Sequence, residues 1–128
     1  MEKVEIIEGG VCSAKGFRAS GVAAGIKYKD RKDVALIVAD APCAAAAMFT
    51  TNTLAAAPVV LDRGIAKYGK AQAILANSGI ANACTGADGL RDAVESVKAT
   101  AAELHVDPRH VFVASTGVIG RRLPMKKL

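Results

Sequence analysis

The stretch "GLRDAVESVKATAAEL", residues 89–104, has the clearest periodicity in this sequence. Its larger apolar residues recur at intervals of four, three, four and three positions, which places them on one face of an α-helix. They are Leu90, Val94, Val97, Ala101 and Leu104. Thr85 or Asp88 is suited to cap the helix, because a short polar side chain accepts hydrogen bonds from the free N–H groups of a first turn. The charged residues are expected off this face, and they are Asp92, Glu95, Lys98 and Glu103.

Apolar segments flank the predicted helix on both sides. "AQAILAN", residues 71–77, precedes it, and "HVFVAS", residues 110–115, follows it after a connection broken by Pro108. A third segment, "VALIVAD" at residues 34–40, is rich in branched residues and is predicted to be a buried strand. A strand, a helix and a strand joined by short links are typical of α/β proteins, so we expect layers of sheet and helix.

The other segments have weaker patterns. We expect a short strand at "KVEII", residues 3–7, and a strand, turn and strand over residues 9–27. Pro42 is expected to end the strand that begins at Val34, and residues 43–52 are interpreted as a further strand. Residues 59–68 are ambiguous and are interpreted as a short strand followed by a helical turn. We expect residues 1–128 to form a single domain or a portion of one.

Composition excludes several classes of function. The formal net charge is +5, and four basic residues near the C-terminus account for most of it. A short basic tail without aromatic residues for stacking is not typical of a nucleic-acid surface. The apolar runs are far shorter than the ~20 residues that cross a bilayer. The charged start "MEKVEIIEGG" lacks the apolar segment of a signal peptide, so the sequence predicts a cytoplasmic protein.

The metal-ligating residue types do not form a recognisable site. The three cysteines, Cys12, Cys43 and Cys84, are widely spaced and odd in number, which fits neither a disulfide framework nor a zinc site. We expect them to be buried thiols that act as small apolar groups. His105 and His110 flank the loop-like "VDPR" without a third ligand nearby. The sequence therefore predicts no metal and no cofactor.

Two glycine-rich loops are candidates for chemistry. "NSGIANACTGADG", residues 77–89, follows a strand and precedes the helix, so its N–H groups could hold a phosphate or it could be a structural crossover. "STGVIG", residues 115–120, ends the last strand. There the Thr116 hydroxyl and the Gly117 N–H could point at one spot, as donors to a developing oxyanion do, or the segment could be an ordinary turn.

Four segments in this order carry a resemblance to a known family: "KGFRASGVAAGIK", "FTTNTLAAAPV", "NSGIANACTGADG" and "VASTGVIGRRLPM". The chain resembles the ornithine acetyltransferase family, also called glutamate N-acetyltransferase, of arginine biosynthesis. The resemblance covers nearly the whole chain, as the N-terminal portion of the α chain. It departs from the family pattern at Ile80, where members usually have Asn. The implied fold is the layered sheet-and-helix sandwich of the family, incomplete in this chain.

The resemblance also implies a mechanism. Family members cut themselves before a threonine that becomes the first residue of a β chain and accepts the acetyl group. Acetyl then passes from N-acetylornithine to glutamate, and some members also accept acetyl-CoA. By motif match the family's oxyanion hole falls on Thr116 and Gly117. The implied partners are the rest of the α chain and the β chain, in an α2β2 assembly, and the nucleophile lies outside this chain.

Two alternatives remain at the level of sequence. One is a self-cleaving aminopeptidase of related architecture, which shares the internal nucleophile and the oxyanion hole. The other is a fragment that contributes only to assembly and has no catalytic role of its own.

Overall fold

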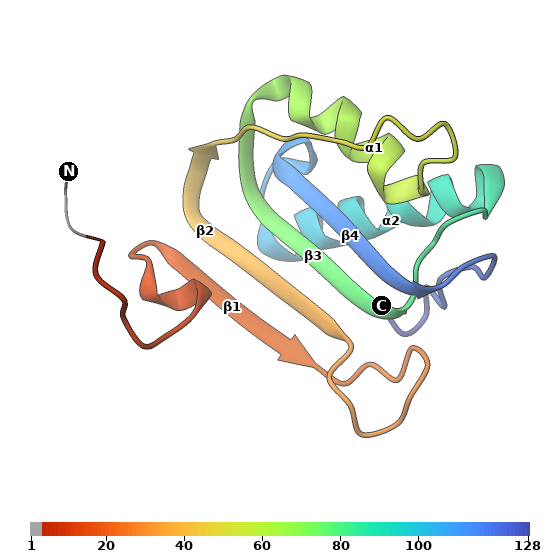
Figure 1. Cartoon of the computed structure of the whole chain (residues 1–128), viewed down its shortest axis with the longest axis horizontal. Helices are drawn as coiled ribbons and strands as arrows, with labels where there is room; N and C mark the ends of the chain where they lie inside the picture. Colours follow the sequence, from red (N-terminus) through yellow and green to blue (C-terminus); the bar gives the residue numbers. More distant parts are fainter. Residues whose placement is uncertain (1–3) are drawn as a thin grey trace.

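The computed structural model describes residues 4–128, which form a four-stranded sheet with two main helices (Figure 1). The strands are β1 (Phe17–Val22), β2 (Val34–Ala44), β3 (Lys70–Ile80) and β4 (Val111–Val118), and they lie side by side in that order. The helices are α1 (Ala57–Ile65) and α2 (Gly86–Leu104). Three short 3-10 turns complete the elements: η1 (Val11–Ser13), η2 (Ala66–Tyr68) and η3 (Pro108–His110). The predicted α/β class is confirmed.

The sheet is mixed. β1 pairs with β2 and β2 with β3 in antiparallel register, whereas β3 and β4 are parallel. A parallel pair of neighbouring strands needs a long crossover, and α2 supplies it. The predicted strand, helix and strand over residues 71–115 are therefore confirmed, and both strands extend beyond their predicted ends.

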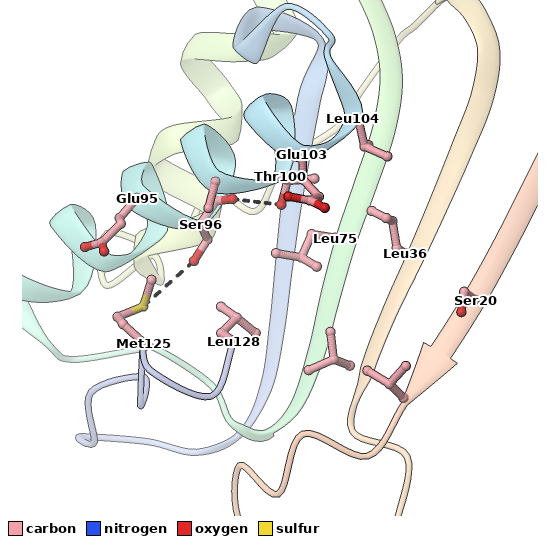
Figure 2. A pocket seen from close by; sticks show the side chains of 13 residues that line it. Ser20, Leu36, Leu75, Glu95, Ser96, Thr100, Glu103, Leu104, Met125 and Leu128 are labelled. Carbon is pink, nitrogen blue, oxygen red and sulfur yellow. Dashed lines mark hydrogen bonds between the residues drawn. The ribbon is translucent and has the colours of Figure 1, made fainter.

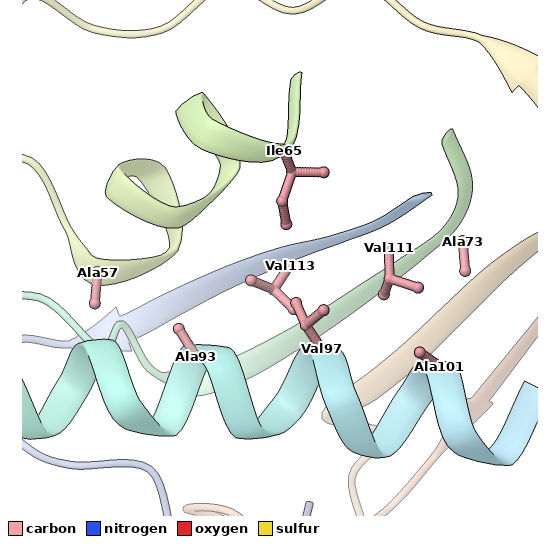
Figure 3. Close-up of a cluster of buried hydrophobic side chains, with 8 residues drawn as sticks. All are labelled: Ala57, Ile65, Ala73, Ala93, Val97, Ala101, Val111 and Val113. Atoms are coloured by element: carbon pink, nitrogen blue, oxygen red, sulfur yellow. The ribbon is translucent and has the colours of Figure 1, made fainter. Parts of the chain in front are cut away.

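The main core lies between α2, α1 and the parallel half of the sheet (Figure 3). Its members are small or branched, which lets the layers approach closely. They are Ala57, Ile65, Ala73, Ala93, Val97, Ala101, Val111 and Val113. Leu75 and Leu36 pack against this cluster from β3 and β2. The other face of the sheet carries Ile37 opposite Ile74, and Ile74 is 40% exposed there.

Helix α2 begins and ends close to its predicted bounds, but it is rotated relative to the predicted stripe. Val97 and Ala101 are buried, whereas Leu90 is 37% exposed. The polar residues Ser96 and Thr100 are buried as well. Each hydroxyl donates a hydrogen bond to the carbonyl oxygen four residues earlier, at 2.8 Å. Such bonds satisfy a buried hydroxyl within its own helix. The stripe prediction is therefore right for the C-terminal half of the helix and wrong at its beginning.

Several predictions for the first half of the chain are wrong. Val4–Ile7 form no strand, and Lys3 lies outside the described residues. Residues 9–27 contain one strand, β1, rather than two. Pro42 does not end β2, because it sits within a register shift between Val38 and Cys43. A proline has no N–H for the ladder and is tolerated at such an irregularity.

The segment after β2 is also corrected. Residues 45–56 have no regular structure, so the strand predicted over residues 43–52 ends at Ala44. Residues 57–65 form α1, with Pro58 in the first turn, so the short strand expected at the start of residues 59–68 is wrong and the helical turn expected after it is right. Proline suits the first turn, because the first N–H groups of a helix have no partner within it. None of the helices among the described residues is long and apolar enough to cross a membrane.

Candidate functional site

The two glycine-rich loops meet at one edge of the sheet. β3 and β4 are parallel, so their C-terminal ends lie side by side, with Ser78 opposite Thr116 and Gly79 opposite Gly117. Beyond the strands, the Ala81 N–H donates to the Val118 carbonyl at 2.9 Å. The two loops, which are separate candidates in the sequence, form one feature in the structure, the paired-loop edge (residues 77–89 and 115–120).

Close backbone contact at this edge requires glycine in both strands. Gly79 has a φ of 108° and Gly117 a φ of 129°, a region that side chains rarely adopt. A Cβ atom added to Gly117 would lie 2.3 Å from the carbonyl carbon of Gly79. One added to Gly79 would lie 2.9 Å from the Cβ atom of Lys27. The two strands thus approach more closely here than side chains would allow.

Neighbouring residues of β4 face opposite sides of the sheet. Ser115 lines a small cavity with Asn77, Ala93 and Ser96, on the side of α2. Thr116 is exposed, on the side that α2 does not cover. Its hydroxyl makes no hydrogen bond to any of the described residues, so it is accessible to a ligand. This placement agrees with the alternation of side chains along a strand.

Asn82 holds the loop between β3 and α2 in place, and sequence reasoning did not single it out. It is fully buried with a φ of 48°. Its Nδ2 donates to the Gly89 carbonyl at 2.8 Å, and its Oδ1 accepts from the Thr85 hydroxyl at 2.8 Å. Its own carbonyl accepts from the Ala57 N–H at the start of α1. Thr85 does occupy the N-cap position of α2, but its hydroxyl is bound to Asn82 rather than to a helix N–H.

A second buried residue, Asp33, fixes the loop before β2 against the same edge. Its carboxylate accepts from the N–H groups of Ala24 at 2.7 Å and Ile26 at 2.6 Å. Its carbonyl accepts from the Ser78 N–H at 2.8 Å. Ile80 packs beside Ile26 in a small apolar cluster, so its side chain has an apolar packing role.

The chain after β4 turns back over α2. Arg122 binds Asp92 through two nitrogens, at 3.0 Å and 2.6 Å, and reaches Asp88 at 3.3 Å. Asp92 was predicted to lie off the buried face, and this is wrong, because it is only 2% exposed. Leu123 is buried beside Ile26 and Ile80. The local sequence around Asp92 does not indicate this burial, because its partner Arg122 lies thirty residues away in the sequence.

The remaining candidate residues lie elsewhere or are exposed. Cys12 and Cys84 are exposed and Cys43 is half-buried, so the prediction of buried thiols is wrong. His110 precedes β4, and Thr116 lies six positions further along the strand, about 20 Å away. Among residues 4–128, no group of three or more His, Cys, Asp or Glu side chains is arranged to hold a metal ion.

A buried carboxyl lies beside β4 without being part of the paired-loop edge. Asp62 of α1 accepts a hydrogen bond from the Val113 N–H at 3.3 Å. Burial raises the pKa of Asp62 to about 6, and the bond from Val113 opposes part of that rise. It satisfies a backbone donor of β4 that the neighbouring strand does not use.

A groove of about 480 Å³ lies between α2, β1–β3 and the end of the chain (Figure 2). Leu36 and Leu75 line its floor, Glu95 and Thr100 lie on α2, and Leu128 closes one side. Thr116 is not among the lining residues. The groove and the paired-loop edge are therefore separate features.

Solved structures define the class of protein to which this fold belongs. The chain matches the crystal structure of arginine biosynthesis bifunctional protein ArgJ from Bacillus halodurans with a TM-score of 0.89 and 46% identity, over 93% of this chain and 62% of that one. It matches ornithine acetyltransferase complexed with ornithine from Mycobacterium tuberculosis with a TM-score of 0.87 and 45% identity, over 92% of this chain and 64% of that one.

The model of the ArgJ family matches residues 18–128. The chain therefore belongs to the ArgJ family, and the resemblance drawn from its four motifs is confirmed. It is 50% identical to the arginine biosynthesis bifunctional protein ArgJ of Symbiobacterium thermophilum, over 98% of this chain. It is 52% identical to that of Caldanaerobacter subterraneus, again over 98% of this chain. The chain spans about a third of these relatives, 32% and 31% of their lengths.

Proposed function

We propose that this chain supplies the oxyanion hole of an acetyltransferase that moves acetyl from N-acetylornithine to glutamate in arginine biosynthesis. The observation that carries the proposal is the geometry at the end of β4. An exposed Thr116 hydroxyl with no hydrogen-bond partner among residues 4–128 precedes Gly117, whose φ of 129° brings the backbone against Gly79. The match to an ornithine acetyltransferase complexed with ornithine supports the choice of substrate.

The nucleophile in this proposal is a threonine hydroxyl outside the chain, freed when the precursor cuts itself. It attacks the acetyl carbonyl of N-acetylornithine, and the carbonyl oxygen becomes negative in the tetrahedral intermediate. The C–N bond then breaks, ornithine leaves with a proton on its amine, and an acetyl-threonine ester remains. The α-amine of glutamate attacks this ester in turn and regenerates the hydroxyl. Acetyl-CoA is a further acetyl donor under the same scheme.

The role of this chain is to stabilise the negative oxygen in both steps. The Thr116 hydroxyl and the Gly117 N–H donate to it, and donors fixed in advance need no reorganisation during the reaction. Their effect falls on the transition state, since the charge they bind is absent from the free substrate. The partners in this proposal are the rest of the α chain and the β chain, as an α2β2 assembly.

Substitution of Thr116 tests the proposal. Thr116→Ala in the assembled full-length protein should lower kcat by roughly 10²–10³-fold, the usual cost of one such donor, with KM little changed. Thr116→Ser keeps the hydroxyl and should retain much more activity. Ser115→Ala is the matched control, because Ser115 faces α2, and its effect should be small.

The measurement is steady-state acetyl transfer from N-acetylornithine to glutamate, with self-cleavage followed on a gel. Cleavage is followed because it is also an acyl shift that the same donors could assist. A fully cleaved Thr116→Ala protein with near-normal kcat would show that "STG" is an ordinary turn. The purified chain 1–128 alone should give no turnover, since it carries no nucleophile in this scheme.

A further inference from the structure

The chain immediately after β4 is held in place by few contacts. Ile119 is 63% exposed, and Gly120 and Arg121 are exposed as well. The Gly120 N–H donates to the Ala83 carbonyl at 2.8 Å, which ties this segment to another loop rather than to a regular element. Beyond Val118, the last residue of β4, the first side chains that bind the packed part of the molecule are Arg122 and Leu123.

Arg122 makes the polar part of this anchor. Its Nε and Nη2 donate to the two oxygens of Asp92 at 3.0 Å and 2.6 Å, and its Nη1 donates to Asp88 at 3.3 Å. Asp92 is in the second turn of α2 and is 2% exposed, so its charge requires a partner. The planar guanidinium matches both oxygens at once, which a lysine ammonium cannot do. The hydrogen bonds with Asp92 raise the pKa of Arg122.

We propose that Arg122 is a positioning residue: its paired bond to Asp92 fixes the turn after β4, and thereby the Thr116 hydroxyl and the Gly117 N–H, against α2. This rests on the proposed function. The anchor connects the two loops of the paired-loop edge. Asp88 and Asp92 lie in the first two turns of α2, where the first loop ends. Arg122 closes the second loop onto that helix five residues after Gly117. Catalytic geometry is sensitive to such anchors, since a displacement of about 1 Å can cost ~10²-fold in rate.

The test compares five variants of the assembled full-length protein. Arg122→Met removes the anchor but leaves Asp92 buried without its partner, which destabilises the fold as well. Asp92→Asn loses the charge and one of the two acceptor oxygens, whereas the double variant Arg122→Met/Asp92→Asn removes the anchor without leaving a buried charge. Arg122→Lys keeps the charge and loses the paired geometry. Arg109→Met is the control, because Arg109 also binds both oxygens of a carboxylate, with its Nε 3.1 Å from Asp107 Oδ1 and its Nη2 2.6 Å from Asp107 Oδ2, in η3 at the opposite end of β4 from Gly117.

A positioning role and a purely structural role predict different results for the double variant. For positioning, its melting temperature returns close to that of the parent protein, while kcat stays roughly 10-fold lower with KM nearly unchanged. Asp92→Asn and Arg122→Lys, which each keep part of the anchor, show intermediate losses of kcat, and Arg109→Met shows none. A double variant with parental kcat, or an equal loss in Arg109→Met, overturns the proposal.

Hydrogen exchange measured by mass spectrometry separates this proposal from the proposed function. The peptide that covers residues 114–123 should exchange faster in the double variant than in the parent protein, while β3 stays protected. Unchanged exchange in that peptide overturns the positioning role, whatever the enzyme acts on. Faster exchange in a parent protein that transfers no acetyl would uphold the anchor and reject the proposed reaction.

Discussion

The two halves of the sheet differ in how they are covered. β3 and β4 form a parallel pair packed against α2, with Val111 fully buried and Val113 5% exposed. β1 and β2 form an antiparallel pair in which Phe17 is 37% and Val22 53% exposed. The paired-loop edge lies on the first half, so the strands that lead into it are held by a close-packed core. The second half contributes to the edge mainly through the loop that Asp33 holds.

The largest effect that this comparison predicts is at Gly117. Gly117→Ala places a Cβ atom 2.3 Å from the Gly79 carbonyl carbon, which is backbone and cannot move aside. We expect a loss on the order of 4 kcal/mol in the free energy of unfolding, in the range of severe single substitutions. Denaturant unfolding of the assembled protein measures it.

Gly120→Ala is the control for that substitution. Gly120 also has a positive φ, 77°, but nothing lies within 4 Å of an added Cβ atom. Only the left-handed backbone penalty applies, about 1–2 kcal/mol. Equal losses at the two glycines would mean that the contact with Gly79 is unimportant.

The second prediction compares the two halves of the sheet through the same substitution in each. Val111→Ala removes two methyl groups from a fully buried site in the core cluster and should cost about 2–3 kcal/mol. Val22→Ala makes the same chemical change at a site that is 53% exposed, and it should cost less than about 0.5 kcal/mol. A cost at Val22 as large as that at Val111 would show that the β1–β2 half is covered in the assembled protein.

A third effect depends on pH. The pKa of Asp62, raised by burial to about 6, means that the folded state holds a proton that the unfolded state releases near pH 4. Stability should therefore fall as pH rises from about 4 to 6 and then level off, by roughly 2 kcal/mol after allowance for partial solvent screening. Asp62→Asn keeps an acceptor for Val113 and should remove this dependence. Parallel pH profiles for the two proteins would contradict this role of Asp62.

The smallest effect on stability should come from the uncovered face of the sheet. Ile74 is 40% exposed beside Ile37, so Ile74→Thr should change stability by about 0.5 kcal/mol or less. It should nevertheless reduce self-association of the isolated chain 1–128 in light scattering, because an apolar face without cover promotes association. Ser20→Thr, a conservative change in β1, is the control and should leave association unchanged. A parent chain that stays monomeric with a sharp melting transition would contradict this view of the uncovered face.

Local patterns in the sequence predicted the elements that depend on local physics. The period of residues 89–104 located α2, and branched apolar runs located β2, β3 and β4. The errors arise where distant residues decide the outcome. Asp92 is buried because Arg122 reaches it, and Pro42 remains in a strand because a register shift accommodates it. α1 replaced a predicted strand because its core partners lie in α2 and β4.

The candidate site was only partly predictable for the same reason. Thr116 and Gly117 were singled out from the residue types and from the family resemblance. The pairing of the two loops follows from parallel strands that end at the same edge, which the strand, helix and strand pattern already implied. Asn82 and Asp33 were not found, because their importance lies in hydrogen bonds that cross between elements.

The exposure of Cys84 has a chemical consequence. This thiol lies in the loop after β3, two residues beyond the buried Asn82, with a left-handed φ of 54°. Reagents that alkylate thiols can therefore reach the paired-loop edge in the folded protein. With Cys12 and Cys43 replaced by serine, a single fluorescent label at Cys84 would sit beside Ala83, whose carbonyl binds Gly120. The same exposure makes intermolecular disulfides a hazard in air, so a reducing agent belongs in every buffer used for the measurements above.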